Sequence, residues 1–196
     1  MDSRRRCLAL SSDVASLGNG KQRQMSQRDS GYERKERDLY ETPAWVTETL
    51  LPHIQSRRLK IWEPAAGTGK MSAVLARSHD VFSSDIENGD DFLKCTTTAC
   101  DAIVTNPPYE LATEFIQHAL VLTQGWGLIA MLLRTDFDHA KTRAHLFADC
   151  PIFARKIVLT KRIRWFEDST GSPSFNHAWF IWNYYHAGPP TLAYAP

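Results

Sequence analysis

The sequence lacks several features that would assign it to a common class of protein. Its four cysteines form no Cys-x-x-Cys pair, and we interpret them as reduced and structural. The longest apolar run, around Leu128 to Leu133, is far too short to span a bilayer. No hydrophobic signal segment opens the chain, which favours a cytoplasmic location. No metal is assigned, because four histidines show no ligand spacing with one another: His118, His139, His145 and His177.

An excess of charge of one sign is also absent, since the net charge is +1. Any contact with nucleic acid must therefore use a local basic patch. The 196 residues, 43% of them hydrophobic, suffice for one domain with a full-sized core. Residues 1–37 are polar and lack apolar periodicity, which predicts a flexible tail. Residues 38–196 form the expected domain.

The middle of the chain has the pattern of an α/β unit. Leu59–Glu63 is an apolar run typical of a buried strand, Pro64–Gly69 is a glycine turn, and a helix follows through Met71 and Leu75. The next predicted strand, 80–85, ends on Asp85 at roughly the spacing of a ribose-binding acid. Residues 86–89 leave no room for a crossover helix, so we expect a loop there and a brief strand end at 91–93.

The other elements complete one sheet. Thr42 and Pro43 have the pattern of a helix N-cap and first helical residue. Core strands are expected at 101–105 and 127–133, with helices at 110–123, where Leu111 belongs to the apolar stripe, and at 139–147. Strands at 157–165 and 178–185 are predicted to pair antiparallel, and Gly188-Pro-Pro is expected to end regular structure. The expected fold class is α/β, with a mostly parallel twisted sheet closed by an antiparallel C-terminal strand and trimmed of one crossover helix.

The residues Asn106, Pro107, Pro108 and Tyr109 follow the predicted strand at 101–105 directly. Neither proline can donate a backbone hydrogen bond, and Pro107 biases Asn106 away from the helical conformation. The strand therefore ends on a stiff turn that presents an amide, bare carbonyl oxygens and an aromatic ring together. These groups suit a planar amine, with acceptors in its plane and a ring against its face. A rigid loop that caps the next helix is the alternative.

The glycine turn distinguishes three kinds of nucleotide site. A phosphate-binding P-loop would need glycine in place of Pro64 and Ser or Thr in place of Met71. A dinucleotide site would need a third glycine in place of Ser72. An acidic residue followed by Ala-x-Gly-x-Gly remains, and it fits a ligand with an adenosine and an amino-acid tail. A tight structural turn is the alternative.

Together these motifs resemble the S-adenosylmethionine-dependent amino-methyltransferases, and specifically the N6-adenine type, over residues 38–186. The resemblance implies a Rossmann-like methyltransferase domain that binds S-adenosyl-L-methionine and methylates adenine in nucleic acid, with DNA favoured. Nothing in the chain matches a separate target-recognition domain, so a partner protein could supply recognition. The implied cofactor-binding residues are Tyr40, Thr42, Pro43, Glu63, Ala65, Gly67, Gly69, Asp85, Ile86, Asp91, Phe92 and Asn106.

The resemblance also implies roles for the motif that follows residue 105. The side-chain oxygen of Asn106 and the carbonyl of Pro107 would each accept an N–H bond of the target amine, which frees its lone pair for attack on the methyl group. Pro108 would keep the turn rigid, and Tyr109 would stack on a base flipped out of the duplex.

Further substrate contacts are expected in and beside the loop 166–177. Either Phe166 or Phe175 could cover the other face of the base, although both also suit a plain core position. The basic cluster 155–164 is the candidate for phosphate contacts, with a solvated strand face as the alternative. The residues predicted to contact phosphates are Lys161, Arg162 and Arg164.

The acceptor itself stays open from the sequence. Enzymes with a similar Asn-Pro-Pro-Tyr motif methylate adenine in RNA or a glutamine amide in proteins, and all these targets offer a planar amine. A catalytically idle module that binds cofactor or nucleic acid is the non-enzyme alternative.

Overall fold

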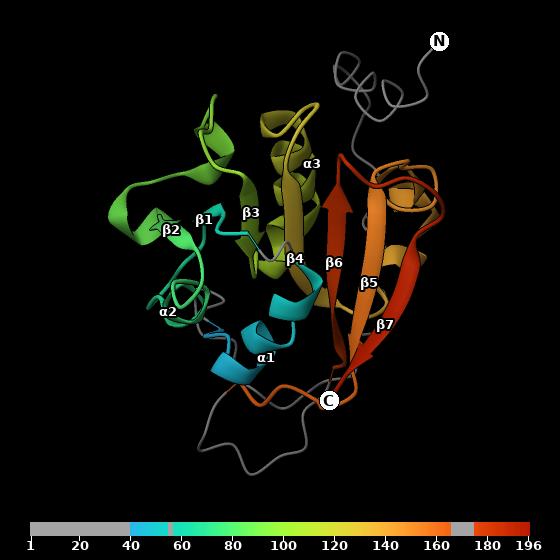
Figure 1. The fold of residues 1–196 in the computed structure, drawn as a ribbon, viewed down its shortest axis with the longest axis horizontal. Helices are drawn as coiled ribbons and strands as arrows, with labels where there is room; N and C mark the ends of the chain where they lie inside the picture. Colours follow the sequence, from blue (N-terminus) through green and yellow to red (C-terminus); the bar gives the residue numbers. More distant parts are fainter. Residues whose placement is uncertain (1–39, 55–56, 166–174) are drawn as a thin grey trace, which may run out of the picture.

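Seven short strands pair into one sheet. The computed structural model describes residues 40–54, 57–165 and 175–196. The strand order there is β2-β1-β3-β4-β6-β5-β7, and β6 runs antiparallel to both of its neighbours while the other pairs are parallel (Figure 1). This arrangement confirms the expected fold class. The strands are β1 Lys60–Glu63, β2 Asp80–Ser83, β3 Ala102–Thr105, β4 Leu128–Arg134, β5 Phe153–Leu159, β6 His177–Asn183 and β7 Thr191–Ala195.

Helices cover both faces of the sheet, which is why its central strands are continuous apolar runs. On one face α1 (Ala44–Glu48) and α2 (Lys70–Leu75) pack against the strands, and α1 is followed by the 3-10 helix η2 (Leu51–His53). On the other face lie α3 (Ala112–Leu122) and the 3-10 helix η7 (Lys141–Leu146). The core is therefore split into two apolar layers with the sheet between them.

Two tryptophans of β6 attach helices to opposite faces of the sheet. Trp179 and Trp182 are completely buried, and their odd spacing along a strand directs them to opposite sides. The indole N–H of Trp179 donates to the backbone carbonyl of Val46 in α1 at 3.0 Å. The indole N–H of Trp182 donates to the carbonyl of Leu146 in η7 at 2.7 Å. Each wide ring thus fills the core while its polar group is paired.

The carboxyl ends of the parallel strands lie along one edge of the sheet. Glu63 at the end of β1 is paired with Ser83 at the end of β2, and Thr105 at the end of β3 is paired with Met131 of the parallel strand β4. The residues that come next in the chain, Asp85 after β2 and Asn106 after β3, must therefore lie at this edge. Ligands of open α/β sheets bind at the carboxyl ends of the strands.

The connection between β2 and β3 contains two 3-10 helices, η3 (Ile86–Asn88) and η4 (Phe92–Lys94), in place of a crossover helix. The predicted strand end at 91–93 is wrong. The Asp91 carboxylate accepts a hydrogen bond from the backbone N–H of Leu93 at 3.1 Å, which stabilises a tight turn instead. Phe92 is buried in the core beneath α3, so the connection is anchored although it lacks a helix.

Three helix predictions need correction. Thr42 does not cap α1, because Pro43 occupies the N-cap position and no side chain caps the helix there. The predicted helix at 139–147 is replaced by η6 (Phe137–His139) and η7. The predicted helix at 110–123 begins with η5 (Tyr109–Leu111), and this tighter turn leaves Leu111 exposed instead of buried in the apolar stripe.

The C-terminal predictions also need correction. Gly188-Pro-Pro does not end regular structure, since β7 follows it and pairs in parallel with β5. The sequence obscured β7 because this edge strand exposes Leu192 and Tyr194 and so is not a buried apolar run. β5 ends at Leu159, well before the predicted end at 165, and a bulge follows Phe153. No helix in the described ranges is long and apolar enough to cross a membrane.

Candidate active site

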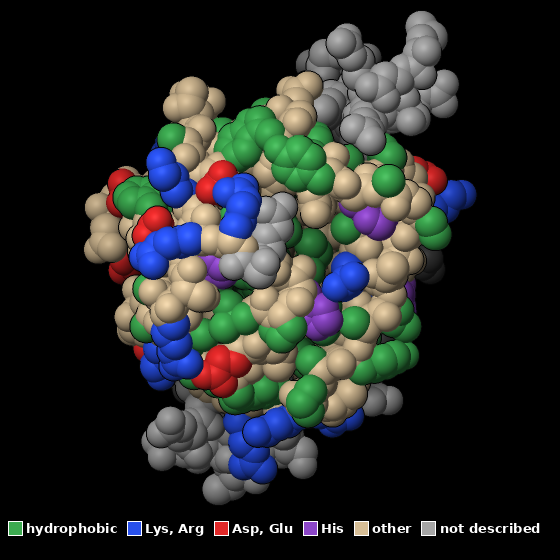
Figure 2. Space-filling model, in the orientation of Figure 1, with side chains coloured by type: hydrophobic (Ala, Val, Ile, Leu, Met, Phe, Trp, Pro, Cys, Tyr) green, Lys and Arg blue, Asp and Glu red, His purple; other side chains and the backbone are tan. Residues whose placement is uncertain are grey.

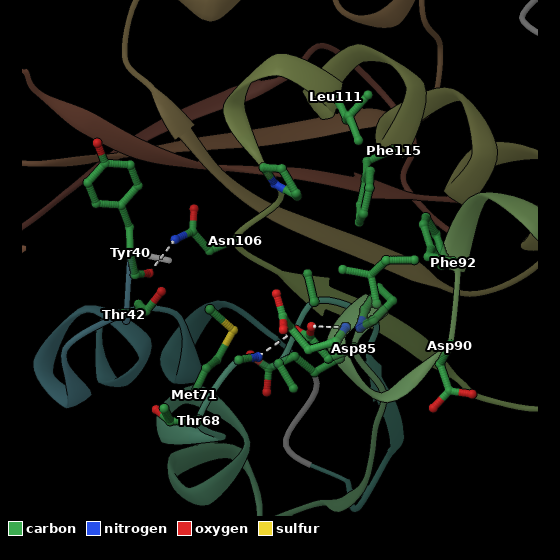
Figure 3. Close-up of a pocket in the computed structure, with 18 of the residues that line it drawn as sticks. Tyr40, Thr42, Thr68, Met71, Asp85, Asp90, Phe92, Asn106, Leu111 and Phe115 are labelled. Carbon is green, nitrogen blue, oxygen red and sulfur yellow. Dashed lines mark hydrogen bonds between the residues drawn. The ribbon is translucent and has the colours of Figure 1, made fainter. Parts of the chain in front are cut away.

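A cavity of about 360 Å³ lies at the carboxyl edge of the sheet (Figure 3). Ligand sites in proteins range from about 300 to 1,000 Å³, so its size suits a small molecule. The turn 64–68 after β1 borders it, and Asp85, Phe92 and Asn106 approach from the segments after β2 and β3. Residues 40–42 complete the border from the N-terminal side.

The glycine turn and Asp85 form one hydrogen-bonded unit. Gly67 and Gly69 have φ angles of 53° and 81°, a backbone conformation that favours glycine. The Asp85 carboxylate accepts a hydrogen bond from the backbone N–H of Gly67 at 2.7 Å and another from that of Glu87 at 2.9 Å. These bonds hold the turn after β1 against the loop after β2, so two sides of the cavity are fixed relative to each other.

Glu63 ends β1 and is only 2% exposed. Its carboxyl group accepts a hydrogen bond from the hydroxyl of Ser72. Burial raises the pKa of Glu63 to about 7; the bond from Ser72 opposes this rise, and the nearby charge of Asp85 adds to it. A carboxyl group with this pKa can ionise near neutral pH when a cation binds beside it.

The lining of the cavity is acidic. Among its described residues there are six carboxyl groups and one ammonium group, Lys70, which forms an ion pair with Glu41. Such a surplus of negative charge repels phosphates and attracts cations. Ile86, Phe92 and Phe115 add an apolar surface that suits a flat ring. The cavity therefore fits a ligand with a cationic part and a flat ring. Its acidic residues are Glu41, Glu63, Asp85, Glu87, Asp90 and Asp91.

Asn106 lies at the border of the cavity, directly after β3 (Figure 3). Its side-chain Nδ2 donates a hydrogen bond to the backbone carbonyl of Tyr40 at 3.2 Å. Its Oδ1 is buried, and within the described ranges no group donates a hydrogen bond to it. An unpaired buried acceptor costs about 1–3 kcal/mol. A position of this kind is one where a donor from a ligand is expected.

Four aromatic rings, Tyr40, Tyr109, Trp165 and His177, form a cluster at the Asn106 motif. The centroid of the Tyr40 ring lies 5.4 Å from that of Tyr109 and 5.3 Å from that of Trp165. Trp165 meets His177 edge-on at 5.2 Å. Tyr109 and His177 are 6.1 Å apart, with ring planes only 27° from parallel. This aromatic cluster brings together the N-terminal segment, the motif after β3, the segment after β5 and the start of β6.

His177 is the polar member of the aromatic cluster and is 2% exposed. Its Nε2 lies 3.0 Å from the hydroxyl oxygen of Tyr109. Burial, aided by the positive charge of Arg134, lowers the pKa of His177 to about 4, while the backbone of Phe175 acts in the opposite direction. The imidazole is therefore neutral at neutral pH. Its Nδ1 is buried and has no hydrogen-bond partner among the residues that the structure describes.

The structure brings most of the predicted cofactor-binding residues to the cavity. Two of them lie outside its lining: Pro43 is the N-cap of α1, and Gly69 is the N-cap of α2. Of the predicted catalytic residues, Pro108 lines the cavity together with Asn106, whereas Pro107 and Tyr109 do not. The predicted residues in the lining are Tyr40, Thr42, Glu63, Ala65, Gly67, Asp85, Ile86, Asp91, Phe92 and Asn106.

The two phenylalanines predicted to cover a base have different outcomes. Phe166 lies outside the described residues. Phe175 is partly exposed, and the guanidinium of Arg134 lies over its ring at 4.0 Å. Arg134 also donates to both carboxylate oxygens of Asp136, at 3.1 and 2.8 Å. Phe175 thus belongs to the surface next to the start of β6.

Two members of the predicted basic cluster, Arg155 and Lys156, form contacts within the fold. Lys156 is largely buried in an ion pair with Asp138 at 2.9 Å, and Arg155 donates to the hydroxyl of Thr191 at 2.9 Å. The face in Figure 2 carries Lys and Arg side chains in several separate groups. The members of the cluster with exposed side chains are Lys161, Arg162 and Arg164.

Several residues at the site were not predicted from the sequence. Met71, Leu111 and Phe115 line the cavity, and Trp165 and His177 belong to the aromatic cluster. For His177 a signal existed, because a polar residue at the head of an otherwise apolar strand is unusual. The other four are apolar residues that the sequence alone does not distinguish from ordinary core.

Comparison with known proteins finds similarity at the level of structure alone. No protein-family model matches the sequence, and no curated protein matches it. A structure assigned to the class I S-adenosylmethionine-dependent methyltransferases, from Listeria monocytogenes, has a TM-score of 0.53 at 16% identity and covers 76% of this chain and 62% of its own. A dimethyladenosine transferase from Plasmodium falciparum has a TM-score of 0.52 at 13% identity, with 74% and 62% covered.

The methyltransferase subunit of a type I restriction-modification system from Streptococcus thermophilus has a TM-score of 0.51 at 12% identity, with 71% of this chain and 42% of that chain covered. The present chain thus spans less than two thirds of the length of each of these three structures. At such identities the similarity shows the fold. The chain has the fold of the S-adenosylmethionine-dependent methyltransferases.

Proposed function

We propose that this chain transfers the methyl group of S-adenosylmethionine to the N6 amino group of adenine in nucleic acid, with DNA as the favoured substrate. The observation that carries the proposal is the Asn106 side chain. Its Nδ2 donates to the carbonyl of Tyr40, and its buried Oδ1 has no hydrogen-bond donor among the described residues. Such an acceptor suits a substrate that brings an N–H or O–H donor, and an exocyclic amine is such a group.

The acidic cavity supports the choice of cofactor. S-Adenosylmethionine carries an ammonium group, a sulfonium group, ribose hydroxyls and a flat adenine ring, and it supplies an activated methyl group when bound. Glu63 would take the ammonium group, and Asp85 would orient the ribose next to the glycine turn that it already holds. Phe92 and Phe115 would contact the adenine ring. These assignments use the charges and surfaces of the lining.

The aromatic cluster supports a nucleobase over a glutamine side chain as the acceptor. The Tyr109 ring, three residues after Asn106, and the Trp165 ring, whose centroid lies 6.5 Å from that of Tyr109, would offer faces on which a flat, aromatic base gains stacking energy, about 1–3 kcal/mol for one base. An aliphatic glutamine side chain gains little from such faces. Two of the similar structures are named as a type I restriction-modification methyltransferase subunit and a dimethyladenosine transferase. The nucleic-acid substrate is carried over to this chain as part of the proposal.

The residues of the chain would act by positioning. Asn106 Oδ1 would accept one N–H bond of the target amine and the backbone carbonyl of Pro107 the other, drawing the nitrogen lone pair out of conjugation with the ring. Burial strengthens both hydrogen bonds because water no longer competes for the acceptors. After the methyl group has been transferred, the amine loses a proton to solvent. The chain therefore needs no strong base.

The test is methyl transfer from tritiated S-adenosylmethionine to four acceptors: duplex DNA, single-stranded DNA, RNA and cell protein. We expect label in nucleic acid, and N6-methyladenine after digestion. Asn106→Ala should reduce transfer by at least about 100-fold, in line with the loss of one preorganised hydrogen bond at a reacting centre. Its cofactor affinity should change by less than a few-fold.

Asn88→Ala is the matched control, because Asn88 is an exposed asparagine of η3 outside the cavity lining. It should transfer methyl groups at the wild-type rate. Label in no acceptor, despite normal cofactor binding, would refute the enzyme proposal. Label in protein alone would refute the nucleic-acid acceptor but retain the role of Asn106.

A further inference from the structure

The contact between Tyr109 and His177 links the Asn106 motif to the start of β6. The Tyr109 hydroxyl oxygen lies 3.0 Å from Nε2 of His177, and the two rings are nearly parallel. The two residues are 68 positions apart in the chain. His177 is itself held in place because it belongs to β6, where it pairs with Arg134 of β4. The phenol of Tyr109 is therefore attached to a rigid element of the sheet.

The two ring nitrogens of His177 have different surroundings. Nδ1 is buried and has no hydrogen-bond partner among the residues that the structure describes, whereas Nε2 lies 3.0 Å from the Tyr109 hydroxyl oxygen. The direction of the Tyr109–His177 hydrogen bond depends on which ring nitrogen carries the proton. With the proton on Nδ1, Nε2 has a free lone pair, and the phenol O–H donates to it.

We propose that His177 is a positioning residue: its neutral Nε2 accepts the phenol proton of Tyr109 and thereby holds the Tyr109 ring at the orientation in which a base stacks beside Asn106. The expected effect of His177 on kcat rests on the proposed methyl transfer. Phenylalanine in place of Tyr109 would leave Nε2 as a buried acceptor without a donor, which explains the use of tyrosine at this position.

The bond completes a chain of contacts around the acceptor site. The carbonyl of Tyr40 fixes the Asn106 amide, the Tyr40 ring packs on Tyr109, and the Tyr109 hydroxyl is fixed by His177. Asn106 and Tyr109, two of the groups expected to touch the target base, are thus each oriented by another residue. His177 is absent from the lining of the cofactor cavity, so its substitution should spare cofactor binding.

The first test compares two substitutions of His177. His177→Gln keeps an acceptor near the position of Nε2, whereas His177→Met fills the space without one. We expect His177→Met to lower kcat by about 10- to 100-fold with an unchanged dissociation constant for S-adenosylmethionine, and His177→Gln to recover most of this loss. His139→Met, at a histidine whose side chain is 70% exposed, is the control and should have no effect. Wild-type kcat in His177→Met, or no recovery in His177→Gln, would overturn the proposal.

The second test asks whether His177 acts through the phenol. Tyr109→Phe removes the hydroxyl group and keeps the ring. If His177 acts through that hydroxyl, His177→Met should lower kcat far less in the Tyr109→Phe background than in the wild type. Equal losses in both backgrounds would show that His177 contributes by some other route and would overturn the proposal.

A third measurement needs no activity and so separates this inference from the proposed function. In protein labelled with ¹⁵N-histidine, the signals that disappear in His177→Gln belong to His177. We expect them to report the neutral Nδ1–H tautomer, and we expect the Nε2 signal to shift in Tyr109→Phe. An Nε2–H tautomer, or no shift in Tyr109→Phe, would overturn the contact. A wild-type protein with these signals but no methyl transfer would instead refute the proposed function.

Discussion

Two buried ionisable groups at the site should make opposite contributions to stability as pH changes. Glu63 has its pKa raised from 4.5 to about 7, chiefly by burial, so the folded chain holds a proton on it between pH 4.5 and 7 that the unfolded chain has lost. Its stabilising contribution is complete below pH 4.5 and is lost as pH rises through 7. A shift of this size corresponds to about 3 kcal/mol.

The contribution of His177 to stability changes with pH in the opposite direction. Burial lowers its pKa from 6.5 to about 4, so the unfolded chain holds a proton between pH 4 and 6.5 that the folded chain does not. The contribution of His177 is complete above pH 6.5 and is lost as pH falls through 4, again by about 3 kcal/mol. Between pH 4.5 and 6.5 the two slopes cancel, and these two residues together leave stability nearly independent of pH.

Single substitutions should reveal separately how each residue changes the free energy of unfolding with pH. In His177→Gln the Glu63 contribution remains, so the free energy of unfolding should fall relative to wild type as pH rises from 4.5 to 6.5. In Glu63→Gln it should rise relative to wild type over the same range. Each difference should approach about 3 kcal/mol, measured by urea unfolding at several pH values. Subtracting the wild-type curve removes the other titrating groups. Parallel curves for His177→Gln and wild type would refute a buried, neutral His177.

Further predictions concern the cofactor cavity and the core. S-Adenosylmethionine should bind about tenfold more tightly at pH 8 than at pH 6, because its ammonium group favours ionised Glu63. Calorimetry should show proton release on binding below pH 7. Equal affinity at both pH values would contradict this role of Glu63. Asp85→Ala should weaken cofactor binding more than it lowers the transfer rate at saturating cofactor. It should also lower the free energy of unfolding by about 2–4 kcal/mol, since two backbone N–H groups lose their acceptor. Tyr184→Phe should cost about 1 kcal/mol in urea unfolding, because the buried hydroxyl donates to the carbonyl of Leu120 at 3.0 Å, whereas Tyr185→Phe at an exposed position should be neutral.

The sequence predicted which segments meet at the carboxyl edge of the sheet, because that arrangement depends on local order. A strand, a glycine turn and a helix are contiguous from Leu59 to Leu75, and an acid ends the next strand. Parallel pairing then brings the ends of β1, β2 and β3 to one edge without any further information. Asn106 was placed at the same edge by the same rule.

The aromatic cluster was not predictable in this way because it depends on long-range contacts. His177 reaches Tyr109 because β6 inserts between β4 and β5, and that strand order has no local signal. The strand end predicted at 91–93 and the helix predicted at 139–147 are 3-10 helices instead. At the first of these, the Asp91 carboxylate accepts a hydrogen bond from the backbone N–H of Leu93, which favours the tight turn. β7 was missed because an exposed edge strand needs no continuous apolar run.

Asn106 divides the site into two parts with different chemistry. On one side the cavity is acidic and suits a cation; on the other the aromatic cluster suits a flat, uncharged ring. Tyr40 belongs to both, since it lines the cavity, fixes the amide of Asn106 through its carbonyl and packs its ring on Tyr109. A cofactor that contacts Tyr40 would therefore help to hold Asn106 and Tyr109, the residues expected to contact the base, in place. Ordered binding, with cofactor before nucleic acid, is the expected kinetic consequence, and Tyr40→Ala should weaken both steps together.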